Sequence, residues 1–287
     1  MRPSEPFALN HFALNHMAAP RRSFAEFAAL ARSIGVARVE MRNDLPGVAL
    51  ADGTPAEAVR READAAGVVI LSINALQRFE DWSDAKAEEA DALAAYARAC
   101  GAAALVLCPT NDALDRRDEA RRRSDLRTAL RELHAVLSVH GVRGLVEPLG
   151  FRECALRRKR DAMDAIEEVG AWNTLGLLHD TFHHALAMEQ EMFPEHTGLV
   201  HVSGVEESSL ALGDMRDGHR VLVGPGDVLG TVDQVRRLRE GGYDGPISFE
   251  PFSAAVHALP DIASALRDSM AALDEASRAR PRASIAE

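Results

Sequence analysis

Acidic and imidazole side chains stand at the ends of several apolar runs in this sequence. Four of them close successive runs: Glu147, Asp180, His201 and Glu250. If the runs are neighbouring parallel strands, these side chains converge on one axis, where unpartnered carboxylates repel one another and raise one another's pKa. A divalent cation removes that conflict, and ligation by oxygen atoms with one imidazole suits Mn²⁺, Mg²⁺ or Co²⁺, with Zn²⁺ as a further option. The pattern therefore predicts one bound metal ion.

Each of these residues also has an ordinary structural explanation. A glutamate at a strand end is commonly solvated or paired with an arginine. Asp180 could cap the helix that follows it, and His201 could be a hydrogen-bonded core histidine. All of these explanations must hold together if no metal site exists, so the coincidence on consecutive strands favours the site. Glu40 and Asn74 end two earlier runs and are further polar candidates at the same edge.

Short apolar runs, each followed by an amphipathic stretch, must position these residues. Continuous apolar runs of this kind are typical of strands covered on both faces. The predicted strands are residues 12–17, 37–41, 68–74, 103–109, 142–148, 174–180, 198–203 and 246–251. Their alternation with helices predicts an α/β fold, a single-domain (β/α)₈ TIM barrel, with reactive side chains at the carboxyl ends of the strands. A doubly wound open sheet is the competitor, but no GxGxxG motif follows the first strand.

Several boundaries follow from this interpretation. Ser23 is the predicted N-cap of the first helix. The helical pattern after the sixth strand covers residues 184–193. The catalytic barrel is expected to span residues 1–276, and the basic tail, residues 277–287, is expected to be disordered.

Composition excludes several classes of function. The chain has 287 residues and a formal net charge of −11, so it repels phosphate backbones and is not expected to bind nucleic acid. No run approaches the roughly 18 apolar residues of a membrane span, and no apolar segment precedes a cleavage site near the N-terminus, so neither membrane association nor secretion is predicted. The three cysteines show no CxxC spacing, which fits a reducing cytoplasm.

Lysine is rare, and this bears on covalent catalysis. Lys86 and Lys159 are the only lysines, and both lie in strongly charged stretches rather than in apolar strands. A Schiff-base lysine needs surroundings that lower its pKa by desolvation. The sequence therefore predicts that neither lysine has a lowered pKa and that Schiff-base chemistry is excluded.

A family likeness is carried by the motifs LVEPLGFRE, LGLLHDTFHH, LVHVSG, GHRVLVGPGD and ISFEPF, and by LSINAL and RVEMRNDLP nearer the N-terminus. Together they resemble the sugar isomerase/epimerase superfamily with a xylose isomerase-like TIM barrel, and within it the inosose isomerases of myo-inositol catabolism. The resemblance implies metal ligation by Glu147, Asp180, His201 and Glu250 and substrate contacts from Glu153, His183 and Arg220. Because barrels of this type often form homo-oligomers, self-association is also expected.

The predicted site can move a proton between carbon atoms. A metal that binds a carbonyl and the adjacent hydroxyl acidifies the C–H bond between them and stabilises a cis-enediolate. Glu147 and Glu250 are then the catalytic pair that removes and returns the proton, while His183 and Arg220 hold the oxygen that gains charge. Phe79 and Trp82 could form an apolar wall against a sugar ring, or could simply pack in the core. The expected activity is isomerisation of a keto-polyol or ketose, with 2-keto-myo-inositol as the leading small-molecule substrate.

Other activities share this scaffold. The nearest alternatives are an inosose dehydratase-type lyase, an open-chain ketose 3-epimerase and a hydroxypyruvate isomerase-like enzyme. A hydride shift would be a rival mechanism, but no strand carries the lysine that assists it in xylose isomerase. A nuclease on this fold would use more histidines and a basic groove, and the acidic balance of the chain argues against it. A pure binding protein would have little use for two opposed carboxylates.

Overall fold

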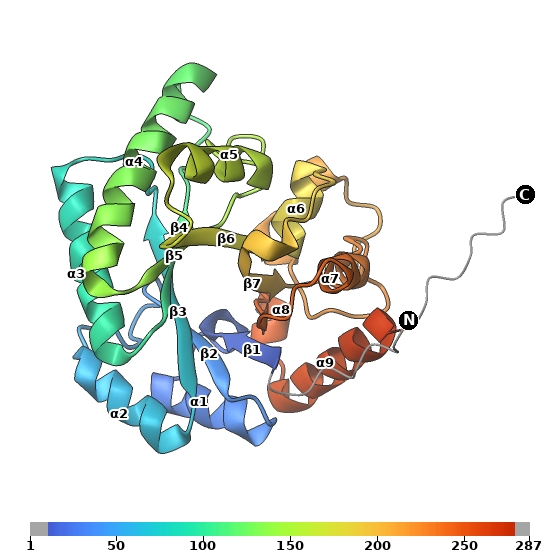
Figure 1. The fold of residues 1–287 in the computed structure, drawn as a ribbon. Helices are drawn as coiled ribbons and strands as arrows, with labels where there is room; N and C mark the ends of the chain where they lie inside the picture. Colours follow the sequence, from blue (N-terminus) through green and yellow to red (C-terminus); the bar gives the residue numbers. More distant parts are fainter. Residues whose placement is uncertain (1–10, 279–287) are drawn as a thin grey trace, which may run out of the picture.

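Eight parallel strands close on themselves in chain order, each paired with the next and the last with the first. This barrel and the surrounding helices are seen in the computed structural model, which describes residues 11–278 (Figure 1). The strands are β1 (Phe12–Asn15), β2 (Arg38–Arg42), β3 (Val69–Gln77), β4 (Ala104–Cys108), β5 (Arg143–Val146), β6 (Leu175–Asp180), β7 (Thr197–Val202) and β8 (Ile247–Phe249). The predicted single-domain (β/α)₈ barrel, including all of its predicted strands, is confirmed.

Helices surround the barrel between successive strands (Figure 1). They are α1 (Phe24–Ser33), α2 (Ala56–Ala66), α3 (Asp84–Cys100), α4 (Glu119–His140), α5 (Lys159–Val169), α6 (Thr181–Ala187), α7 (Thr231–Glu240), α8 (Ala254–His257) and α9 (Ile262–Arg278). The predicted N-cap of α1 is confirmed, since Ser23 Oγ accepts from the backbone N–H of Glu26 and the Glu26 carboxylate accepts from the backbone N–H of Ser23.

Two helix boundaries differ from the sequence prediction. The helix after β6 begins at Thr181, not at residue 184, because the side chain of Asp180 caps its first turn and starts the helix at the strand end. At the C-terminus, α9 continues to Arg278, so the first two residues of the expected disordered tail are helical. Residues 279–287, the rest of that tail, lie outside the described residues.

The barrel interior has an apolar layer beneath a polar one. Leu145, Leu178 and Leu199 belong to a small apolar cluster that is separate from the large core between strands and helices. Because side chains alternate between the two faces of a strand, residues two positions further on point the same way. This alternation places Glu147, Asp180 and His201 above the leucines, at the carboxyl-end mouth of the barrel. The apolar layer supports the polar one.

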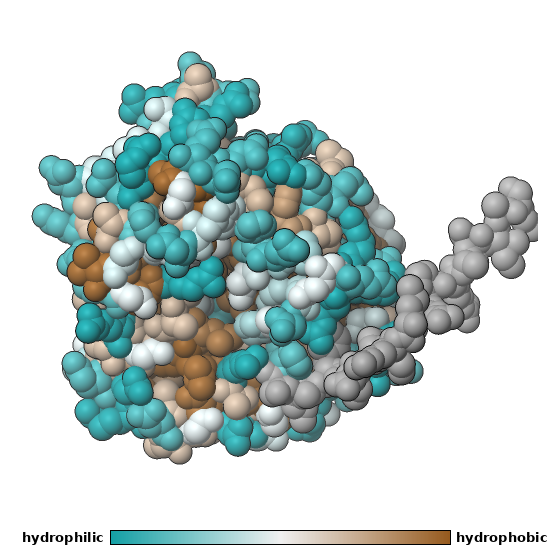
Figure 2. All heavy atoms as spheres, in the orientation of Figure 1, coloured by the Kyte–Doolittle hydropathy of each residue, from teal (hydrophilic) through white to brown (hydrophobic). Residues whose placement is uncertain are grey.

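The outer surface shows no dominant apolar region in the view of Figure 2, where hydrophilic side chains predominate and apolar ones lie in separate groups. Within residues 11–278, no helix is long and apolar enough to span a membrane.

Candidate active site

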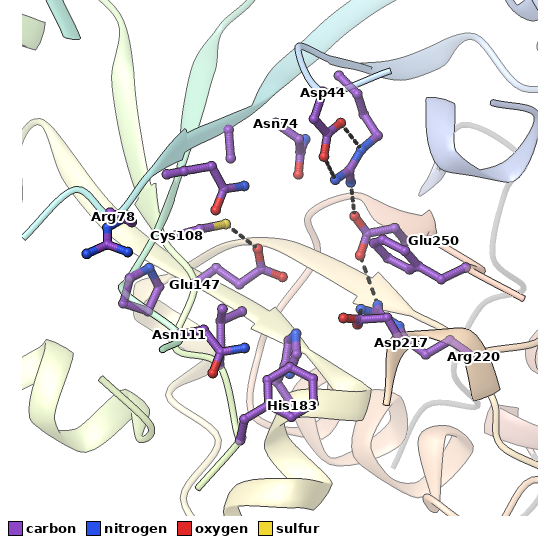
Figure 3. Close-up of a pocket in the computed structure, with 17 residues that line it drawn as sticks. Asp44, Asn74, Arg78, Cys108, Asn111, Glu147, His183, Asp217, Arg220 and Glu250 are labelled. Atoms are coloured by element: carbon purple, nitrogen blue, oxygen red, sulfur yellow. Dashed lines mark hydrogen bonds and ion pairs between the residues drawn. The ribbon is translucent and has the colours of Figure 1, made fainter. Parts of the chain in front are cut away.

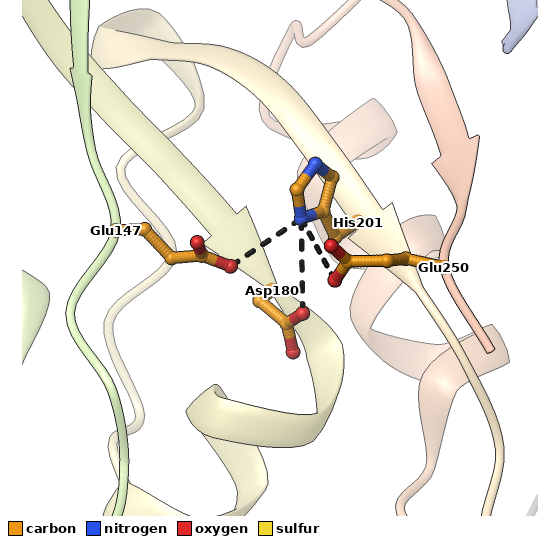
Figure 4. A group of neighbouring side chains, drawn as sticks. All are labelled: Glu147, Asp180, His201 and Glu250. Carbon is orange, nitrogen blue, oxygen red and sulfur yellow. Dashed lines mark ion pairs between the residues drawn. The ribbon is translucent and has the colours of Figure 1, made fainter. Parts of the chain in front are cut away.

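The last four strands bring together the residues predicted to bind a metal. Glu147 follows β5, Asp180 ends β6, His201 lies in β7 and Glu250 follows β8 (Figure 4). One ligand atom from each residue lies within 4.8 Å of the corresponding atoms of the others, and all four residues are buried. Oxygen donors with a single imidazole nitrogen suit Mn²⁺, Mg²⁺, Co²⁺ or Zn²⁺. The cluster can therefore hold one divalent ion.

The ring of His201 supports this interpretation. Its Nδ1 lies 3.2 Å from Glu250 Oε2 and 3.3 Å from Glu147 Oε1, yet this fully buried atom makes no hydrogen bond within the described part of the chain. A buried polar atom that makes no hydrogen bond needs an explanation, and an ion bound between it and the carboxylates would supply one. Burial would lower the pKa of His201, but the charges of Glu250 and Glu40 outweigh burial and raise that pKa well above its usual value.

Asp180 serves two structural roles with its two oxygens. Oδ1 accepts from the backbone N–H of His183 at 2.9 Å and caps α6. Oδ2 faces the cluster, 3.9 Å from His201 Nδ1, and accepts from Arg220 Nη2. The sequence left a helix cap and a metal ligand as alternatives for Asp180; the cap is confirmed, and the second oxygen lies in the four-residue cluster.

Two arginines compensate the charge of Glu250. Arg42 Nη1 donates to its Oε1 at 2.8 Å, and Arg220 Nη2 donates to its Oε2 at 2.9 Å. Burial would raise the pKa of Glu250, but the charges of His201 and Arg220 outweigh burial and hold that pKa below its usual value. Asp44 in turn accepts two hydrogen bonds from Arg42. The carboxylate of Glu250 is therefore held ionised in a fixed position.

A cavity of about 400 Å³ opens beside these residues, within the size range of small-molecule sites. Glu147 and Glu250 lie on opposite sides of it (Figure 3). His183 and Arg220, two of the three predicted substrate-binding residues, also line it. The third, Glu153, is half-buried and is not among the lining residues.

Several lining residues were not among the predicted site residues. Arg42 and Asp44 come from β2 and the loop after it, and Arg42 lies two positions after Glu40, so strand alternation could have revealed it. The aromatic part of the wall consists of Phe151 and Phe252. By contrast, Phe79 is buried in the large core and Trp82 packs against that core, so packing is their role.

The expectation for Lys159 is wrong. This first residue of α5 is 3% exposed, and its Nζ lies 2.7 Å from Nδ1 of His179, on the helix-covered face of β6. Burial lowers the pKa of Lys159 to about 7. The burial of Lys159 could not be predicted from the charged stretch RRKR, because only this one of its four residues turns inward. Lys159 is not among the residues that line the 400 Å³ cavity.

Comparisons with known proteins bear on the family and the fold. A family model described as "Xylose isomerase-like TIM barrel" matches residues 28–276. A xylose isomerase domain-containing protein from Salmonella typhimurium LT2 is 32% identical, with 94% of this chain and 99% of that chain covered and a TM-score of 0.87. No curated protein matches the chain in sequence.

Two more distant structures share the fold. The IolI protein with a bound zinc atom is 18% identical, with 93% of this chain and 96% of that chain covered and a TM-score of 0.77. D-psicose 3-epimerase from Clostridium cellulolyticum H10, solved with D-tagatose, is 13% identical, with 93% and 96% covered and a TM-score of 0.67. At these identities the likeness extends to the fold alone.

Proposed function

The chain belongs to the xylose isomerase-like TIM-barrel family, and on that premise we propose that it is a divalent-metal-dependent isomerase or epimerase of a keto-polyol or ketose. The observation that carries the proposal is the pair of carboxylates, Glu147 and Glu250, which face each other across the cavity and both belong to the buried four-residue cluster (Figure 3). A purely structural metal site would not need to open on a cavity with two opposed bases.

The metal-binding part of the proposal rests on the donor set. Glu147, Asp180, His201 and Glu250 would hold the ion, and the zinc of the IolI structure makes Zn²⁺ one candidate beside Mn²⁺, Mg²⁺ and Co²⁺. When bound, the ion would polarise a substrate carbonyl and the neighbouring hydroxyl and so acidify the C–H bond between them.

The chain's own residues would then move the proton. Glu147 Oε1 faces the cluster, whereas its Oε2 accepts, among residues 11–278, only a thiol hydrogen bond, from Cys108 Sγ at 3.4 Å. This oxygen is therefore available to a substrate in the cavity. Glu147 would take up the C–H proton, and Glu250, from the opposite wall, would deliver a proton that it takes up from solvent; the two roles exchange in the reverse direction. Both sides of a planar, enediolate-like carbon framework are thus within reach of a carboxylate.

His183 and Arg220 would bind the substrate oxygen that gains charge. His183 Nδ1 is buried without a hydrogen-bond partner among the described residues, and the side chain lines the cavity. Arg220 is held by Asp180, Glu250 and Ser203, whose Oγ accepts from Nε at 3.0 Å. A fixed donor of this kind stabilises developing charge without reorganising. Phe151 and Phe252 offer apolar surface to the C–H face of the substrate.

The leading substrate is 2-keto-myo-inositol, supported by the sequence motifs and by the fold shared with IolI. Proton NMR tests it: the Mn²⁺-loaded protein acts on 2-keto-myo-inositol in D₂O, and Mn²⁺ is removed before the spectrum is recorded. A new keto-inositol isomer that carries deuterium next to the carbonyl is the expected product.

Any other result of the NMR experiment would point to a different reaction or substrate. A product short of one water would assign a lyase of the inosose dehydratase type, and an isomer without deuterium would contradict proton exchange through Glu147 or Glu250. An unchanged substrate would reject the inositol assignment. Open-chain ketoses would then be the next substrates, since a 3-epimerase of such a sugar shares this fold.

A further inference from the structure

A buried acid outside the ligand set lies directly behind the proposed metal site. Glu40, in β2, is 0% exposed and is not among the residues that line the cavity. Transferring a carboxylate from water into a protein interior costs several kcal/mol unless charge and hydrogen bonds compensate it. Interior positions of a TIM barrel are usually filled by branched apolar residues. A carboxylate at such a position therefore needs a buried partner that donates a hydrogen bond to it or carries a positive charge.

That partner is the imidazole of His201. Its Nε2 lies 3.0 Å from Glu40 Oε2, and the two side chains form an ion-pair contact with both groups fully buried. Figure 4 shows the ring with one nitrogen directed at the three ligand carboxylates and the other directed away from them. Glu40 therefore contacts Nε2 of the ring, whereas Nδ1 of the same ring faces Glu147 and Glu250.

Donors from neighbouring strands fix the position of Glu40. Its Oε2 accepts from Ser72 Oγ at 2.6 Å and from Asn74 Nδ2 at 2.9 Å, both in β3. Asn74 Nδ2 also lies 2.9 Å from Ser72 Oγ, which ties these two donors together. On the other side, Asn15 Nδ2 lies 3.1 Å from Glu250 Oε1 and 3.5 Å from Glu40 Oε1. The carboxylate is held by β1, β3 and β7 and cannot turn away from the ring.

The contact decides which nitrogen of His201 is available. An ionised carboxylate only accepts hydrogen bonds, so the nitrogen that faces Glu40 must carry a proton. With Nε2 protonated and a cation bound, the ring would be neutral and would present the lone pair of Nδ1 to that cation. The opposite tautomer would point an N–H at the cation and set the lone pair of Nε2 against the carboxylate of Glu40. Partners of this kind fix the orientation of metal-binding histidines and raise their basicity.

We propose that Glu40 is a positioning residue: it accepts the Nε2–H of His201 and so directs Nδ1 to the metal. The proposal rests on the metal-dependent function proposed above and adds a residue that acts through His201 without touching substrate. It predicts that Glu40 controls metal affinity more than substrate affinity.

The test measures metal binding directly. Zn²⁺ affinity is determined by competition with a chelator for the wild-type protein and for Glu40→Gln, which keeps size and removes charge. We expect affinity to fall by about 10- to 100-fold in the variant, with the KM for substrate at saturating metal little changed. The matched control is Glu80→Gln, because Glu80 is equally buried but accepts from the backbone N–H of Thr110 and from Arg117; its Zn²⁺ affinity should equal that of the wild type.

A second measurement does not depend on the variant folding. In ¹⁵N-histidine-labelled, Zn²⁺-loaded wild-type protein, the long-range proton–nitrogen spectrum should show His201 with a proton on Nε2 and the metal on Nδ1. Unchanged Zn²⁺ affinity in a folded Glu40→Gln protein would overturn the proposal, as would coordination through Nε2. If the wild-type protein binds no metal at all, the proposed function fails instead, so the two failures are distinguishable.

Discussion

The two faces of β6 carry two buried polar clusters, and the two clusters accommodate buried ionisable side chains in opposite ways. On the inner face, Asp180 joins Glu147 and Glu250, and these acids lie beside two arginines and an imidazole. On the outer face, the next residue back, His179, contacts Lys159 and Gln234. The inner cluster matches charge with opposite charge. The outer one removes charge, because burial lowers the pKa of both Lys159 and His179.

This difference in charge indicates different roles for the two clusters: the inner one is suited to binding and catalysis, and the outer one to holding the structure together. A charged, compensated cluster that opens on a cavity can bind a cation and a polar substrate. The outer cluster opens on no comparable cavity and instead joins elements: Lys159 begins α5, Gln234 lies in α7, and its Nε2 donates to the backbone oxygen of Thr181 at the start of α6. We infer that the outer cluster holds these helices against β6, and three predictions test that division.

The largest expected effect is on catalysis. Glu147→Gln should lower kcat by about 10²- to 10⁴-fold, the usual contribution of a positioned acid or base, with the fold preserved because glutamine has the same size. Turnover of the keto-polyol and circular dichroism measure the two properties. Lys159→Met is the control from the outer cluster and should retain kcat within about threefold. An equal loss of kcat in both variants would mean that the two clusters act as one unit.

The stabilisation of the folded state by a metal ion should depend on the inner cluster and not on the outer one. An ion at 100 times its Kd stabilises the folded state by about 2.7 kcal/mol, so Zn²⁺ should raise the free energy of unfolding of the wild type by this amount. Asp180→Asn should lose most of the gain, whereas Lys159→Met should keep it. Urea titrations with and without Zn²⁺ measure the difference. The assignment of Asp180 as a ligand fails if its variant is stabilised as strongly as the wild type.

The smallest effect concerns the pH dependence of stability. Folded protein releases the Lys159 proton near pH 7, whereas the unfolded chain retains it up to the usual pKa of 10.5. Between these values the unfolded state binds more protons, so stability rises with pH, by about 1 kcal/mol from pH 7.5 to 8.5. Lys159→Met should lack this contribution. Subtracting the variant's urea titrations from those of the wild type isolates it, and parallel pH curves would show that Lys159 stays charged when buried.

Much of the fold follows from local patterns in the sequence. Continuous apolar runs such as Leu175–Leu178 are typical of buried strands, and the spacing of Ser23 and Glu26 is typical of a helix start. The grouping of Glu147, Asp180, His201 and Glu250 could also be predicted, because the topology brings every strand end to the same mouth. A cytoplasmic location and self-association remain predictions from sequence.

What the sequence could not show depends on distant contacts. Lys159 lies in a run of basic residues, and only the packing of α5 on β6 buries it. Phe151 and Phe252 form the cavity wall because loops separated by a hundred residues meet there. Glu40 was visible as a strand-end acid, but its contact with His201 crosses the barrel from β2 to β7. Alternation along a strand predicts which face a side chain occupies, not which partner it meets across the interior.

The cap that Asp180 forms on α6 couples two functions within four consecutive residues. One oxygen of Asp180 faces the cluster while the other fixes the N–H of His183, the residue that lines the cavity. The segment Asp180–His183 therefore behaves as a single rigid part with a set spacing. Each residue inserted into or removed from it would rotate the following side chains by about 100° around the helix axis. Thr181 and Phe182, which lie between Asp180 and His183, are both fully buried, so divergence of substrate preference must preserve their number and is also restricted in their types.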